Sequence, residues 1–303
     1  MAKHLILWGF VGVVAFYLML DLGLLHKQAR SITLRQAAWQ SLLIVLIALG
    51  FGAFIAYEKG PNAAIEYYSA YTMEYALSMD NIFVILLILR YFSIEPQYYH
   101  RVLFWGVVGA MVMRGIFIFA GVLLVKKFHW VLYVFGAFLV WAGIRNLFKK
   151  EGPPDLSQNV FLRFLTRYLR ITTAPHQGKF ILRRQGRRFF TLLALALLMI
   201  ELTDLIFAVD SIPAAFAITQ DEDVLFSSNI FAVMGLRSMF FLLAAVIERF
   251  WALEYGISIV LIGIGLKMFQ DLVGLHIEPI VSLLFILGTL SASIAVSLMI
   301  RRG

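Results

Sequence analysis

The chain has 303 residues, of which 61% are hydrophobic and 15% are charged. A soluble domain carries about 25% charged residues, and bands of about 20 apolar residues, the length that spans a bilayer, recur along this sequence. The composition therefore excludes a soluble protein. The absence of cysteine excludes disulfides, thiolate metal sites, iron–sulfur clusters and cysteine nucleophiles.

Apolar stretches bounded by polar or turn residues predict an all-α, polytopic membrane protein with about nine transmembrane helices in a single transmembrane domain, 1–303. The first stretch is long enough to span and no small-x-small cleavage site follows it, so we interpret it as a helix rather than a signal peptide. The predicted spans are 5–25, 37–57, 67–92, 102–125, 129–148, 189–218, 229–247, 255–273 and 278–300.

One long hydrophilic loop, about 149–188, separates the fifth and sixth spans. It holds ten lysines and arginines against Glu151 and Asp155, a difference of +8 that equals the formal net charge of the chain. The positive-inside rule predicts that this loop is cytoplasmic, with the N-terminus outside, the C-terminus inside, and the protein in a bacterial cytoplasmic (inner) membrane. We expect the loop to contact anionic membrane lipid; it contains no nucleic-acid recognition motif, so no nucleic-acid partner is expected.

Two segments inside predicted spans share a pattern: an acid, five residues, aspartate, a polar residue and isoleucine. EYALSMDNIFVI starts at Glu74 and DLIFAVDSIPAA starts at Asp204. They predict two repeats, about 67–148 and 189–273. Because each has three spans, the second is inverted, as in many secondary transporters whose sites lie at the repeat interface. The matching pairs are Glu74 with Asp204, Asp80 with Asp210, Asn81 with Ser211, and Arg114 with Arg237.

Carboxylates are rare inside spanning helices because each charge costs about 2.5–3.5 kcal/mol at the helix centre. The two arginines, Arg114 and Arg237, can neutralise only part of the set, which leaves negative charge for a cation or for protons. Pro213 is expected to free backbone carbonyls beside the last of these acids. The acids that lie well inside predicted spans are Glu74, Asp80, Glu201, Asp204 and Asp210.

The side chains around these acids favour a hard cation. The polar neighbours are oxygen ligands, the histidines lie near the ends of predicted spans or in loops, and thiolates are absent, so magnesium, calcium or manganese is favoured over zinc or copper. Met73, Met79 and Met199 adjoin the acids. A thioether ligand would favour manganese, whereas ordinary packing in the lipid phase is the other interpretation.

The segments EYALSMDNIFV (74–84), ELTDLIFAVDSIPA (201–214) and NIFAVMGLRSMFFLL (229–243) resemble the TerC family of integral membrane proteins. The family is named for tellurium resistance, and several members are associated with manganese efflux. The nine spans and the long central loop resemble its manganese-exporting, alkaline-pH-responsive branch. The resemblance implies a metal transport site lined by Glu74, Asp80, Asn81, Glu201, Asp204, Asp210 and Ser211.

We therefore expect a secondary transporter that exports a divalent metal cation, Mn²⁺, in exchange for protons. No GxxxxGK[ST] motif is present, so an ion gradient or the membrane potential must drive transport. No cofactor is expected beyond the transported metal, and the oligomeric state stays open. The alternatives are Ca²⁺ transport, a tellurium-resistance function, and a scaffold for loading metal onto exported proteins. An intramembrane aspartyl protease would need YD and GxGD motifs, which are missing, so no enzyme is expected.

The predicted topology can be tested with reporter tags. Tags inserted in 149–188 or at the C-terminus should report the cytoplasm, and tags at the N-terminus or near Asp221 should report the outside. An outside signal from the basic loop would contradict the inverted arrangement.

Overall fold

The computed structural model describes residues 33–148, 170–172, 178–184, 187–243, 251–273 and 277–300, together with positions 10, 12 and 14. The predicted first span, most of the basic loop, residues 244–247 of the seventh span, and both chain ends lie outside the described residues. So do certain side chains within the helices and strands, namely those of Met79, Asp80, Phe83, Arg184, Arg187, Asp210, Asp271 and Val273.

Helices in the described residues correspond to predicted spans two to nine, with shifted ends. The third-span helix begins at Pro61 rather than 67, and the seventh-span helix at Glu222 rather than 229, because proline and acidic residues stabilise a first helical turn that extends beyond the apolar band. The helices are α2 (Leu34–Lys59), α3 (Pro61–Tyr91), η1 (Pro96–Tyr98), α4 (Tyr99–Lys127), α5 (Val131–Leu147), α7 (Leu192–Ile218), α8 (Glu222–Leu243), α9 (Leu253–Lys267), α10 (Gln270–Val273) and α11 (Pro279–Met299).

Length and composition identify the helices that can cross a membrane. Among the described residues, five are long and apolar enough: α2, α4 with its preceding turn, α7, α8 and α11. Helix α5 is apolar but has 17 residues. Helix α3 has 31 residues but carries internal acids, and α9 has 15 residues. The chain is thus a helical membrane protein with several apolar spans.

A small sheet occupies part of the segment predicted as a loop. It has the strand order β1-β3-β2, with β1 (Ile171–Thr172) parallel to β3 (Arg187–Thr191) and β2 (Ile181–Arg184) antiparallel to β3. The all-α expectation missed these strands because their apolar residues are few and lie beside arginines. The sixth-span helix consequently starts at Leu192 and not at 189.

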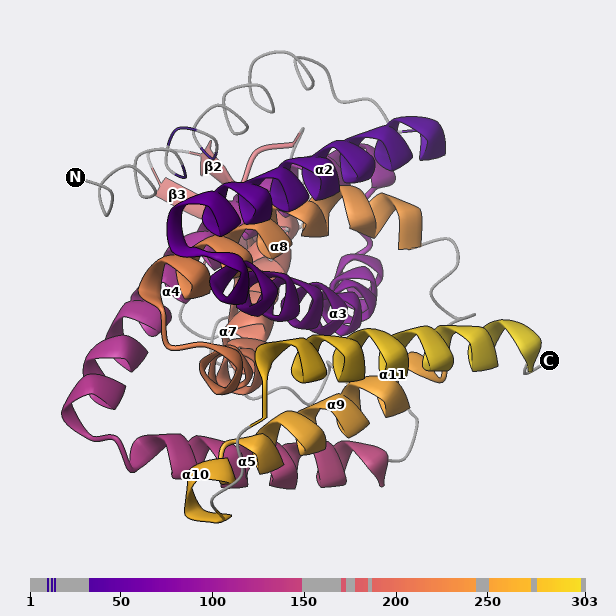
Figure 1. Ribbon diagram of the computed structural model, residues 1–303. Coiled ribbons are helices and arrows are strands. Elements are labelled where there is room, and N and C mark those ends of the chain that lie inside the picture. Colours follow the sequence, from indigo (N-terminus) through magenta and orange to yellow (C-terminus); the bar gives the residue numbers. More distant parts are fainter. Residues whose placement is uncertain are drawn as a thin grey trace.

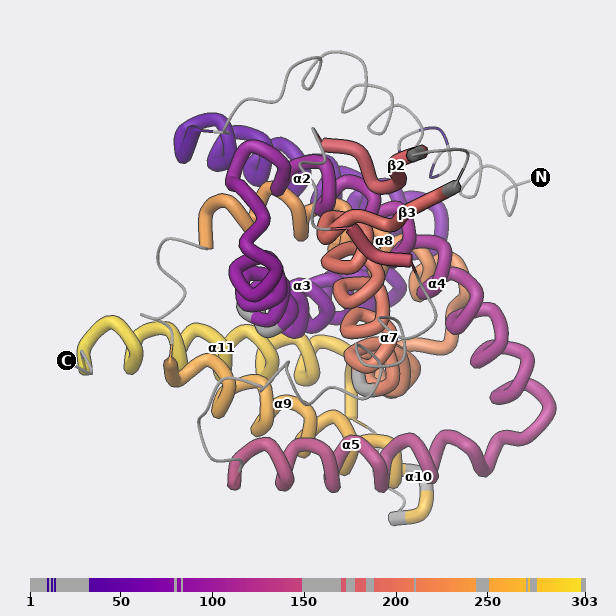
Figure 2. Tube along the Cα trace, turned by 180° about the vertical axis from the view of Figure 1, so that it is seen from behind, coloured from indigo at the N-terminus to yellow at the C-terminus, as the bar shows by residue number. Residues whose placement is uncertain are grey.

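The two helices that carry the acid motifs, α3 and α7, lie next to each other inside the bundle (Figure 1). Helix α3 contacts α2, α7, α8 and α11, whereas α7 contacts α3, α4, α5 and α9. Helices α5, α9 and α11 run alongside one another in both views (Figures 1 and 2). The acids of α3 and α7 therefore lie between packed helices. The inverted repeat stays a prediction.

Glycines allow α5 and α9 to approach within backbone contact. A Cβ on Gly136 would lie 2.9 Å from the carbonyl oxygen of Gly265, and a Cβ on Gly265 would lie 2.8 Å from that of Gly136. A Cβ on Gly143 would lie 2.7 Å from the carbonyl oxygen of Ser258. Small residues at such crossings are typical of membrane helices, where close van der Waals packing drives association.

Replacing Gly265 with alanine should lower the free energy of unfolding by about 1–3 kcal/mol, because two backbones would have to separate. Thermal unfolding of the purified protein in detergent measures the effect. Gly288→Ala in α11 is the matched control, since a methyl group added at Gly288 would have no atom within 4 Å. Equal stability of the two variants would contradict the close packing of α5 on α9.

Candidate cation site

Arg114 of α4 lies at the centre of a buried ion-pair cluster. Its side chain is 1% exposed. Its Nη2 donates to Asp204 Oδ1 at 2.9 Å and its Nε donates to Asp204 Oδ2 at 3.2 Å, a two-point contact with a carboxylate on α7. Arg114 also forms an ion pair with Glu74 on α3. One arginine thus joins the leading acids of the two motifs.

Two asparagines complete the cluster. Asn229 of α8 donates from Nδ2 to Glu74 Oε2 at 3.0 Å, and its Oδ1 accepts from Arg114 Nη1 at 3.3 Å. Asn81 of α3 donates from Nδ2 to Asp204 Oδ1 at 3.2 Å. Asn229 is not among the site residues predicted from the sequence. A buried polar residue at the start of the NIFAVMGLRS segment was the signal that could have indicated it.

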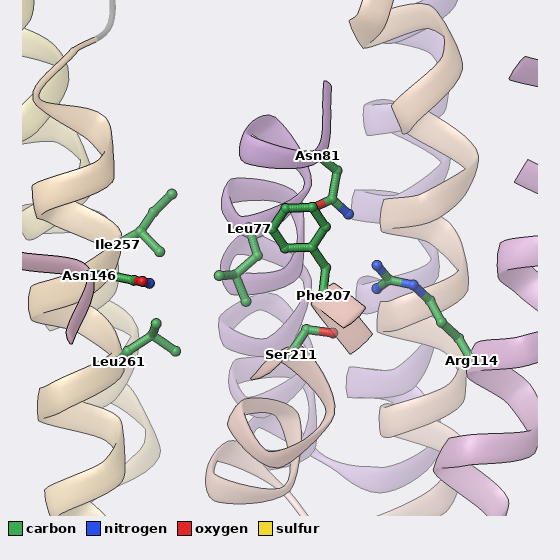
Figure 3. A pocket seen from close by; sticks show the side chains of 8 residues that line it. All are labelled: Leu77, Asn81, Arg114, Asn146, Phe207, Ser211, Ile257 and Leu261. Carbon is green, nitrogen blue, oxygen red and sulfur yellow. The ribbon is translucent and has the colours of Figure 1, made fainter. Parts of the chain in front are cut away.

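Next to this cluster is a small pocket between α3, α4, α5, α7 and α9, with a cavity volume of about 30 Å³ (Figure 3). Asn146 and the α9 side chains line one wall and face the α3 and α7 side chains, while Arg114 points toward Asn81 from the other side. The lining residues are Leu77, Asn81, Arg114, Asn146, Phe207, Ser211, Ile257 and Leu261.

Two oxygens of the pocket lining are buried without a hydrogen-bond partner in the described structure: Asn81 Oδ1 and Ser211 Oγ. Both residues are 3% exposed or less. The amide nitrogen of Asn81 is engaged by Asp204, so its oxygen stays available. Most buried polar atoms in proteins are hydrogen-bonded, and a pocket that offers free oxygens can accommodate water or a cation.

Asp80 and Asp210 directly precede these two residues on α3 and α7. The positions of their carboxyl groups lie outside the described structure. Helix α7 continues through Pro213. Because proline has no N–H, the carbonyl of Val209, adjacent to Asp210, lacks its helical donor.

Glu201 lies one turn before Asp204 on α7 and packs against α4 at Gly109. A Cβ at Gly109 would overlap the Glu201 carboxyl group, so a larger residue there would displace the Glu201 side chain. Glu201 Oε2 is buried and has no hydrogen-bond partner within the described structure. Glu201 therefore lies beside the Arg114 cluster without being bonded to it.

The described carboxylates do not form a metal centre by themselves. Among the described side chains, no group of three or more acids or histidines lies close enough together to hold an ion. Met73 and Met199 are buried in apolar clusters and do not line the pocket. Their placement supports packing as their role rather than ligation.

Comparison with known proteins gives one family. The model for the integral membrane protein TerC family matches residues 59–303. An "Uncharacterized membrane protein STKORF319" of Myxococcus xanthus is 42% identical over 298 residues, covering 98% of this chain and 93% of the relative. A "Putative membrane-bound redox modulator Alx" of Salmonella typhi is 40% identical over 303 residues, covering 96% and 94%. No solved structure matches the chain.

Replacing Arg114 with leucine should lower the free energy of unfolding by about 3–5 kcal/mol, because Glu74 and Asp204 would be left buried without their counter-charge. The fraction of protein that stays folded in detergent and the midpoint of its thermal unfolding measure this loss of stability. Arg145→Leu is the control, since this arginine stacks on Trp141 at 5.2 Å near the exposed end of α5 and should contribute less than about 1 kcal/mol. Wild-type stability of the Arg114 variant would contradict the ion-pair cluster.

Proposed function

This chain belongs to the integral membrane protein TerC family, and from that premise we propose that it is a secondary transporter that exports a divalent metal cation, Mn²⁺, with protons as the exchanged ion. The observation that carries the proposal is the pocket between α3 and α7 in which Asn81 Oδ1 and Ser211 Oγ are buried without partners among the described residues. Such a site lies where the two acid motifs meet.

The charge distribution supports a divalent ion. Arg114 compensates Glu74 and Asp204, whereas Asp80 and Asp210 stand beside the free oxygens in sequence. A divalent cation would supply the two positive charges that these aspartates require inside a bilayer. Carboxylate, amide and hydroxyl oxygens are ligands that suit manganese, calcium and magnesium. The preference for manganese among these rests on the family resemblance.

The alternative functions are distinguished from manganese export by the charge of the pocket, by the cysteine content of the chain and by metal flux. A tellurium oxyanion would need exposed positive charge, but Arg114, the one basic residue among the described side chains that line the pocket, is paired with two carboxylates. The name of some relatives assigns them a redox role; this chain has no cysteine, so it cannot perform thiol–disulfide exchange. Calcium transport and metal loading of exported proteins are distinguished from manganese export by metal flux measured in vesicles.

Asp80→Asn and Asp210→Asn should each reduce manganese export by at least about tenfold while the protein accumulates normally, because an amide keeps the shape but removes the charge that binds the ion. The reduction in export is measured as Mn²⁺ uptake into everted membrane vesicles and as the sensitivity of cells to added manganese. Glu278→Gln, an exposed carboxyl before α11, is the control and should transport normally. Wild-type flux in either aspartate variant, at equal protein level, would remove that residue from the site.

Ser211→Ala tests whether the buried hydroxyl of Ser211 contacts the ion, without changing the charge of the site. It removes one buried oxygen from the pocket and should raise the manganese concentration needed for half-maximal transport several-fold. Ser282→Ala in α11 makes the same chemical change at another buried hydroxyl without a partner in the described structure, away from the pocket, and should leave transport unchanged. Equal kinetics in the two variants would show that the hydroxyl of Ser211 does not contact the ion.

A further inference from the structure

The β2–β3 hairpin places arginines opposite each other in two neighbouring rungs. Arg183 pairs with Arg188, and Arg184 pairs with Arg187. Adjacent strands lie about 4.8 Å apart and successive residues of a strand face opposite sides of the sheet, so each face of the hairpin carries one closely spaced pair of cationic positions. Like charges directly opposite one another destabilise a sheet. A ligand of opposite charge would remove that cost.

The chain around these rungs supplies no acid. Between Asp155 and Glu201 the sequence contains no aspartate or glutamate, and the ion pairs of the described residues do not include Arg183 or Arg188. Both side chains are exposed, as are those of Arg170 and Lys179 nearby. The compensating negative charge must therefore come from outside the hairpin.

The hairpin is held at the start of α7, a helix that can cross a membrane (Figure 2). The Thr191 hydroxyl caps α7 by accepting from Ala194 N at 3.3 Å, and it contacts the carbonyl oxygens of Lys179 and Phe180 at 2.9 and 3.1 Å. Phe180 packs on a core cluster, and Arg101 lies over its ring at 5.7 Å. These contacts fix the arginines at one end of the bundle.

The rungs change from apolar to basic with distance from α7. The first two pair Phe190 with Ile181 and Phe189 with Leu182; the next two are the arginine pairs. Alternate residues of a strand share a face of the sheet, so Ile181, which is 46% exposed, lies on the same face as Arg183. An exposed apolar side chain beside basic ones is the pattern of a membrane interface, where the apolar part enters the lipid and the cation reaches the phosphate.

We propose that the β2–β3 hairpin binds the phosphate groups of anionic phospholipids. Guanidinium groups bind phosphate through two parallel hydrogen bonds, and paired arginines can share one headgroup or hold two neighbours. A lipid is favoured over nucleic acid because the hairpin is fixed where a spanning helix begins and exposes apolar surface on the same face. This site is independent of the transported ion.

The experiment titrates short-chain phosphatidylglycerol into the full-length protein in a neutral detergent, with bound lipid counted by native mass spectrometry. Phosphatidylglycerol should bind more tightly than phosphatidylcholine. Each arginine near an anionic lipid contributes about fivefold in affinity, so Arg183→Gln with Arg188→Gln should weaken phosphatidylglycerol binding by about 25-fold. Arg183→Lys with Arg188→Lys, which keeps the charge but loses the two-point contact, should fall in between.

The matched control is Lys126→Gln with Lys127→Gln, which removes the same charge at the end of α4 and should leave lipid binding unchanged. If the double arginine variant does not fold, the single Arg183→Gln variant should show the fivefold loss. Equal binding of both lipids, or unchanged binding in the arginine variants, would overturn the proposal. Inorganic phosphate that competes at equal affinity would indicate a simple anion site instead, and tighter binding of single-stranded RNA would indicate a nucleic-acid partner; either result overturns it.

Discussion

The cost of placing charge inside a membrane-spanning bundle governs how this structure is arranged. Removing one partner of a buried ion pair is expensive because the remaining charge has no solvent to stabilise it. Arg114 supplies the counter-charge for both Glu74 and Asp204. Asn81 and Asn229 donate further hydrogen bonds to the same two carboxylates. Four helices, α3, α4, α7 and α8, each contribute to this one cluster, so their relative positions are fixed by it.

The same cluster leaves the adjacent pocket oxygens free. Asp204 engages the amide nitrogen of Asn81, which leaves the amide oxygen without a partner in the described structure, and Ser211 offers a second oxygen from the facing helix. A structural ion pair and an incomplete polar site thus share two residues, Asn81 and Arg114. Movement of α4 would change both, because Arg114 lines the pocket and holds the cluster. In the proposed transport, a cation that binds beside Asn81 would alter the surroundings of the buried pair.

Much of this arrangement follows from the sequence because it depends on local patterns. Apolar length predicted the helices from α2 to α11, and the cost of burying charge predicted that Arg114 pairs with an intramembrane acid, as it does. The early starts at Pro61 and Glu222 and the strands at 171–191 depend on capping and cross-strand pairing, which hydropathy does not register. The role of Asn229 depends on which helix face meets α3, and a single sequence does not fix that face.

The central claim is that a divalent cation binds in the pocket beside Asn81 and Ser211, and anomalous diffraction locates such an ion directly. Data collected near the manganese absorption edge from crystals soaked in Mn²⁺ should give a peak within about 2.6 Å of Asn81 Oδ1 and of the Ser211 hydroxyl, and the peak should vanish in the Asp80→Asn, Asp210→Asn double variant. A peak confined to the half-buried acids near Asp221, or persistence of the pocket peak in the double variant, would contradict the account.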